Sequence, residues 1–106
     1  MAAIEWHEDA WRLFNDHVDY ARYEFGSKTS NKWLKEMADI DKWLRLFPES
    51  YTQEPLLRGR AIVYRYCRIM KRFKIIYHYD KTEDIVHVVD LWDTLQNPAT
   101  LVHRIE

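Results

Sequence analysis

The sequence predicts an α+β fold, in which a short N-terminal strand and a helical hairpin pack on a small antiparallel sheet. Apolar residues recur at steps of three and four between residues 8 and 47, which is the period of a helix. After residue 60 the period changes to two, as in strands with one buried face. At 106 residues, with 47% hydrophobic residues, we expect a single domain over residues 1–106.

The first half is expected to form a strand over residues 2–6 and then two helices. The first helix begins at Glu8 and ends at Gly26, which suits a left-handed cap. The second runs from Ser30 to Phe47 and stops before Pro48. The apolar stripes are Ala10, Trp11, Phe14, Val18, Ala21 and Phe25 in the first helix, and Trp33, Leu34, Met37, Ile40, Leu44 and Phe47 in the second. Because the link is short, the helices should be antiparallel.

The second half reads as a loop followed by a three-stranded meander. Residues 48–59 carry two prolines and a glycine, which is typical of a loop. We expect strands over 61–69, 72–79 and 85–92, with a polar turn at 80–84. Asn97-Pro98 ends the last strand, and the tail to residue 106 is a short helix or an extended arm.

Alternation along the strands predicts which side chains share a face, if Met70-Lys71 is the first turn. The face toward the helices then holds Ile62, Tyr64, Tyr66, Phe73, Ile75, Tyr77, Tyr79, Val86 and Val88. The open face holds Arg65, Cys67, Lys74, Ile76, His78, His87 and Val89. Cys67 would lie across from Lys74, and His78 from His87. A one-residue slip would bury Arg65 and Lys74 under the helices, which is costly.

Residues 58–79 form an unusual basic segment. They contain seven Lys and Arg residues and no Asp or Glu, although the whole chain has a net charge of −1. Such a surface suits phosphate backbones or an acidic partner peptide. The near-neutral total argues against indiscriminate nucleic-acid binding. The plainer alternative, that exposed charges keep a sheet soluble, is equally open.

Several classes of protein are disfavoured by composition. A single cysteine, Cys67, cannot form an internal disulfide and fits a reducing cytoplasm. We expect no signal peptide, no membrane span and, with two glycines, no glycine-rich phosphate loop. The five histidines and one cysteine show no metal-ligand spacing, so we expect no metal and no cofactor.

The predicted open face suggests a candidate chemistry. Arg65 and Lys74 can hold phosphates and stabilise negative charge in a transition state. His78 and His87 titrate near neutral pH and can transfer protons. Together they would suit a metal-independent ribonuclease, in which the 2′-OH of the substrate attacks its own phosphate. Each histidine taken alone is more simply a cross-strand partner.

The chain resembles the RelE/ParE superfamily, toxins of bacterial type II toxin–antitoxin modules with a β-α-α-β-β-β order. The resemblance is carried by Leu57-Arg58-Gly59, by Tyr64-Arg65, and by Phe73-Lys74-Ile75-Ile76-Tyr77. The segment from Asp90 to Pro98 is similar to the family's strand-end segment. The first half matches in pattern only.

The resemblance implies one of two activities. RelE-like members cut mRNA in the ribosomal A site with basic side chains of the open sheet face, whereas ParE-like members inhibit DNA gyrase without such chemistry. The leading hypothesis is translation inhibition by ribosome-dependent mRNA cleavage, and an inactive fold that only binds its antitoxin is a third alternative. Candidate catalytic residues are Arg65, Lys74 and His87; candidate RNA-binding residues are Arg58, Arg60, Arg68, Lys71, Arg72 and His78.

Two positions depart from the RelE-like pattern, and the resemblance also implies a partner. Cys67 stands near a further strand cation of the family, and Leu95 or Gln96 near its strand-end arginine. The implied partner is a small cognate antitoxin with a partly disordered segment that wraps the toxin, giving a hetero-oligomer. The open basic face and the grooves beside the helical hairpin are candidate antitoxin surfaces. Ribosome, mRNA or gyrase are possible further partners, and no membrane is expected.

Overall fold

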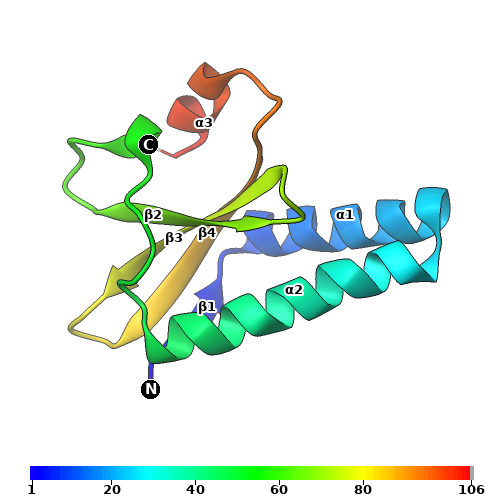
Figure 1. Cartoon of the computed structure of the whole chain (residues 1–106). Helices are drawn as coiled ribbons and strands as arrows, with labels where there is room; N and C mark the ends of the chain where they lie inside the picture. Colours follow the sequence, from blue (N-terminus) through cyan, green and yellow to red (C-terminus); the bar gives the residue numbers. More distant parts are fainter. Residues whose placement is uncertain (106) are drawn as a thin grey trace.

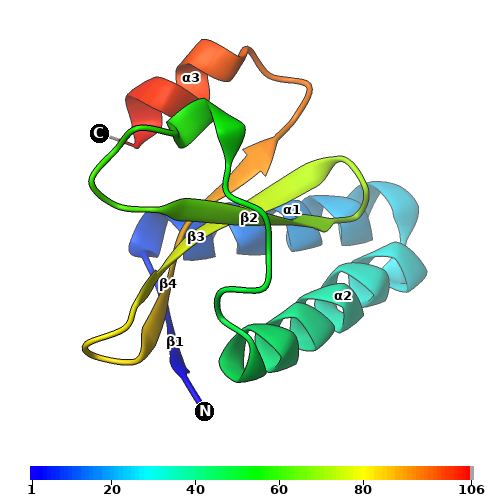
Figure 2. The same ribbon diagram turned by 60° about the vertical axis from the view of Figure 1, so that its left-hand side comes forward.

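The computed structural model describes residues 1–105 and has a four-stranded mixed sheet, in the order β1-β4-β3-β2. The elements are β1 (Ala3–Trp6), α1 (Glu8–Phe25), α2 (Ser27–Leu46), the 3-10 helix η1 (Pro55–Leu57), β2 (Tyr64–Ile69), β3 (Phe73–Asp80), β4 (Ile85–Asp93) and α3 (Pro98–Arg104). The α1–α2 hairpin lies on one side of the sheet, and α3 with η1 lies on the other (Figures 1 and 2). The predicted fold class is confirmed. None of the described helices is long and apolar enough to cross a membrane.

The first strand has a role that the sequence did not reveal. β1 pairs with β4 in parallel, with Ile4 beside Val86 and Trp6 beside Val88. This pairing brings the beginning of the chain next to its last strand. The predicted meander is therefore completed to a mixed sheet.

The helical hairpin was predicted correctly in kind but is tighter than expected. Gly26 alone connects the helices, so α2 begins three residues earlier than the predicted Ser30. The φ angle of Gly26 is 91°, a conformation that side-chain-bearing residues rarely adopt. The stripes are also narrower than predicted, because Trp11, Phe25, Leu34 and Phe47 are exposed. The residues that the helices bury are Ala10, Phe14, Val18 and Ala21 in α1, and Ser30, Trp33, Met37, Ile40 and Leu44 in α2.

The register predicted for β2 was wrong by one residue. Ile69 pairs with Phe73, so the turn contains three residues rather than two, and Cys67 lies across from Ile75 instead of Lys74. Met70 and Lys71 adopt φ angles of 52° and 61°, which this turn requires. Every β2 side chain consequently lies on the face opposite to the predicted one. The predicted pairing of His78 with His87 is confirmed.

Both faces of the sheet are buried, so the predicted open face is largely covered. The helix-side core includes Cys67, Ile69, Phe73, Ile75, Tyr77, Val86, Val88 and Leu91. The opposite core consists of Leu57, Tyr64, Ile76, Trp92, Leu101 and Ile105. The tail forms a helix, one of its two predicted conformations, and Leu101 of α3 is fully buried. Glu106, the last residue of this tail, lies outside the described residues.

We predict that Leu101→Ala destabilises the fold by about 3 kcal/mol, because it leaves a cavity between α3 and the sheet. Urea unfolding measures the loss. The matched control is Val102→Ala, whose side chain is 37% exposed and should change the free energy of unfolding little. Equal losses for both variants would show that α3 is not packed as described.

Candidate functional site

Lys74 lies on the outer face of the sheet, the face covered by α3 and η1, and its charge is neutralised there. Its ammonium lies 3.0 Å and 3.3 Å from the carboxylate oxygens of Glu54. It also lies 4.0 Å from the centroid of the Tyr66 ring. The Lys74 side chain is only 14% exposed, and that of Glu54 is fully buried. A buried cation that is paired in this way stabilises the packing, and it would have to leave its carboxylate in order to bind a phosphate.

Arg65 lies on the other face, so the prediction that Arg65 and Lys74 share a face was wrong. Arg65 pairs with Tyr77, whereas Lys74 pairs with Arg68. The guanidinium donates a hydrogen bond of 2.8 Å to the carbonyl of Tyr51 and lies 4.0 Å from Glu49. The Arg65 side chain lies on the helix side without complete burial, because β2 is an edge strand and a long arginine side chain can extend past that edge.

Three imidazoles, His7, His78 and His87, form what we call the imidazole cluster. His78 and His87 stack with ring centroids 4.8 Å apart and an interplanar angle of 20°. His7, which precedes α1, lies 5.6 Å from His87 and 6.5 Å from His78. The Tyr64 ring meets His78 edge-on at 5.6 Å. Sequence reasoning missed His7, because only the parallel pairing of β1 with β4 brings it here.

The surroundings of His78 within the imidazole cluster favour its neutral form. Burial lowers the pKa of His78, and the neighbouring His87 and His7 lower it further, while Asp80 acts in the opposite direction. A cleft of about 460 Å³ opens beside the cluster, with His7, His78, Tyr64 and Arg104 in its lining. A neutral imidazole at His78, beside this cleft, can accept a proton.

Arg104 borders this cleft and joins α3 to the sheet. It forms a very short ion pair with buried Asp90, and its guanidinium lies 5.5 Å from the centroid of the Trp92 ring. Burial raises the pKa of Asp90, and the charge of Arg104 counteracts this. Through Arg104, α3 thus places a cation against Asp90 and Trp92 of β4.

The other predicted RNA-binding cations do not form one continuous surface. Arg60 donates to the carbonyl of Val102 in α3 at 2.9 Å. Arg72 holds Asp93 with two hydrogen bonds of 2.9 Å and 2.5 Å, although Arg72 is half exposed. The remaining cations, Arg58, Arg68 and Lys71, are exposed, and within residues 1–105 they form no ion pair. Most of the basic segment thus takes part in local structure.

Two other chemistries find no support at the described positions. Within the part of the chain that the structure describes, no three His, Cys, Asp or Glu side chains are arranged to hold a metal ion. Cys67 is buried among apolar side chains of the helix-side core, and burial raises the pKa of its thiol to about 12. A thiol in that state is a poor nucleophile at neutral pH.

Comparison with known proteins identifies the family. A family model described as the ParE toxin of the type II toxin–antitoxin system, parDE, matches residues 4–98. The chain belongs to the ParE toxin family. This ParE-family toxin gives no match in a search of curated proteins. The resemblance to the RelE/ParE superfamily is confirmed, and membership implies an antitoxin as partner.

Several solved structures have a fold similar to that of the ParE-family toxin. A structure of the chromosomal ParDE system from P. aeruginosa is 12% identical, has a TM-score of 0.66, and the match covers 88% of this chain and 96% of that one. A metal-bound toxin from Helicobacter pylori is 20% identical, with a TM-score of 0.63 and coverages of 88% and 94%. The E. coli RelE toxin is 14% identical, with a TM-score of 0.58 and coverages of 100% for both chains. At these identities the likeness establishes the fold alone.

We predict that Glu54→Gln destabilises the ParE-family toxin by about 3 kcal/mol, because Lys74 keeps its charge in a site without a counter-ion. Glutamine retains an oxygen that can accept the Leu56 N–H, so the cap of η1 is preserved. The double variant Glu54→Gln/Lys74→Met should lose less stability than the sum of the two single variants. Urea unfolding of the four proteins gives the coupling. Strict additivity would contradict the ion pair.

We predict that the toxin becomes less stable as the pH falls from 7.5 to 5.5. An unfolded histidine has a pKa of about 6.5, and burial lowers the pKa of His78 and of His17 in the folded state. The unfolded chain therefore binds more protons in this window, and acid favours unfolding. The free energy of unfolding of His78→Gln should depend less steeply on pH than that of the wild type, with His17 supplying a remainder. Identical slopes would argue against the imidazole cluster.

Proposed function

We propose that this toxin acts by binding its target without breaking a bond, and that the target is DNA gyrase, as the sequence resemblance implies for ParE-like members. The observation that carries the proposal is the separation of Arg65 and Lys74 onto opposite faces of the sheet. A single phosphate cannot contact both. Each of them also has a carboxylate beside it, Glu49 and Glu54 respectively.

The cover on the outer face supports the same proposal. Ile76 and Trp92, which flank Lys74 on that face, are almost completely buried. An RNA strand could reach Lys74 only after η1 or α3 had moved and Glu54 had been displaced. Displacing a buried carboxylate from its cation costs several kcal/mol, on the order of 3–5.

The second candidate is ribosome-dependent mRNA cleavage, and the imidazole cluster favours it. His78 and His87 could transfer protons, and the cleft beside them is bordered by Tyr64 and Arg104. In this candidate His87 and His78 would act as acid and base, and Arg104 would take the place of Arg65 and Lys74 in stabilising charge. In either candidate the toxin is a cytoplasmic protein, where the buried thiol of Cys67 stays reduced, and its antitoxin holds it inactive in a complex until it is released.

Induced expression in a permissive host should separate the two candidates. Binding inhibition predicts growth arrest, loss of gyrase supercoiling activity in the presence of purified toxin, and no new RNA ends within coding frames. Arg65→Ala and His87→Gln should keep the arrest under this proposal, because neither residue is needed to break a bond. Circular dichroism controls for folding.

Two other results would contradict binding inhibition of gyrase. New RNA ends within coding frames that disappear in His87→Gln, with gyrase unaffected, would replace the proposal with the second candidate. The absence of growth arrest in every permissive host would contradict both and leave an inactive toxin fold that binds its antitoxin.

A further inference from the structure

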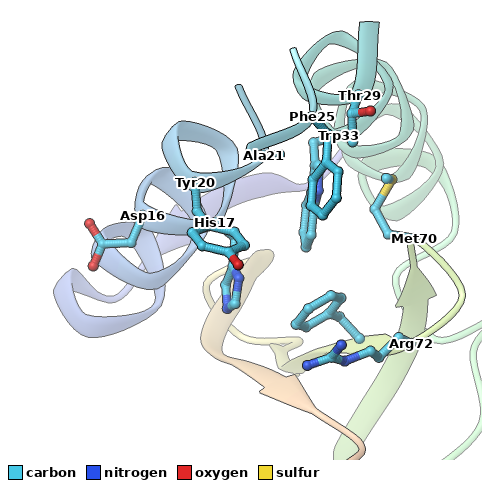
Figure 3. Close-up of a pocket in the computed structure, with 10 residues that line it drawn as sticks. Asp16, His17, Tyr20, Ala21, Phe25, Thr29, Trp33, Met70 and Arg72 are labelled. Carbon is cyan, nitrogen blue, oxygen red and sulfur yellow. The ribbon is translucent and has the colours of Figure 1, made fainter. Parts of the chain in front are cut away.

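A groove of about 730 Å³ opens between the distal part of the helical hairpin and the β2–β3 turn (Figure 3), and no residue of the imidazole cluster lines it. Three aromatic side chains form its floor. His17 stacks on Trp33 with centroids 5.5 Å apart and an interplanar angle of 8°. Phe73 lies 4.6 Å from His17 and 4.9 Å from Trp33. The floor is thus a preformed aromatic surface, which costs little ordering when something binds to it.

The rim on the helix side is aromatic and unusually exposed. Tyr20 and Phe25 are 59% and 68% exposed, and their rings meet edge-on with centroids 6.3 Å apart. Both residues belong to α1 near Gly26. Neither Tyr20 nor Phe25 is packed in the core, although each could bury a large apolar area against a partner.

The rim on the turn side is basic. Arg72 lines the groove, and Lys71 precedes it in the turn. Arg68 donates to the carbonyl of Lys71, so a third cation lies beside the same turn. Asp93 neutralises Arg72, but Arg68 and Lys71 form no ion pair within residues 1–105. Asp16 of α1 is also among the lining residues, and its carboxylate points away from the aromatic floor in Figure 3.

We propose that this groove receives an aromatic or large aliphatic side chain of the cognate antitoxin, from a segment that also carries acidic residues facing the β2–β3 turn. An apolar anchor matches the aromatic floor and the Tyr20–Phe25 rim, and carboxylates match Arg68 and Lys71. The inference shares one premise with the proposed function, namely that the toxin has an antitoxin, and family membership implies this partner. It does not depend on how the toxin acts on its target.

The test is the affinity of purified toxin for its antitoxin, measured by calorimetry. The double variant Tyr20→Ser/Phe25→Ser should bind about 30-fold more weakly, as expected when two anchors at one hot spot are lost. The matched control is Tyr23→Ser, which lies on the same helix, is 88% exposed and does not line the groove. It should bind within about twofold of the wild type.

A second pair of variants tests the charge. Lys71→Glu should weaken binding and make the affinity less dependent on salt, because an attractive pair is lost. Lys42→Glu, an exposed change of the same size near the other end of α2, should leave both quantities unchanged. Equal effects of the two charge reversals would overturn the acidic part of the proposal.

Other outcomes would overturn the groove itself. Wild-type affinity in Tyr20→Ser/Phe25→Ser would do so, and so would a dimer of the isolated toxin that this variant converts to monomers. In cells, the variant should keep its growth arrest but escape neutralisation by the antitoxin. Loss of arrest with antitoxin binding intact would assign the groove to the target instead. If even the wild type causes no arrest, the proposed function fails, yet the binding measurement still decides this inference.

Discussion

Strand β3 buries Ile75 and Tyr77 against the helical hairpin and Ile76 against η1 and α3, so the sheet needs cover on both faces. This constraint explains the arrangement around it. The loop that carries η1 must cross the outer face, and it brings Glu54 to Lys74. The short C-terminal helix is required as a second cover, and it is fastened by Leu101 and by the ion pair between Arg104 and Asp90.

The sequence was sufficient to predict most helices and strands, but insufficient to predict how the strands pair with one another. Periodicity locates both helices and the three later strands, because a stripe or an alternation is a local property. The register of β2 depends on whether its turn holds two residues or three, and apolar alternation on both faces gives no penalty for the wrong choice. The pairing of His78 with His87 was predicted correctly, because the turn between β3 and β4 was placed correctly and this turn sets the register of the two strands.

The prediction that Arg65 and Lys74 share an open basic face was wrong because it relied on the composition of one segment. Residues 58–79 contain no acidic residue, yet Glu49 and Glu54 reach Arg65 and Lys74 from the preceding loop, and Asp93 reaches Arg72 from β4. The charge balance of a folded protein is three-dimensional, so a run of cations in sequence does not establish a field at a surface. The catalytic and RNA-binding roles of these residues remain predictions.

The parallel pairing of β1 with β4 also orders events during synthesis. Strand β1, which precedes the other strands in the sequence, has its partner in β4, Ile85–Asp93, which follows them all. A nascent chain that lacks β4 has no surface to receive β1, and α1, which packs on β4, cannot settle either. Folding of the sheet is therefore postponed until β4 has been synthesised. The surfaces that depend on the complete sheet therefore form only once β4 has joined it.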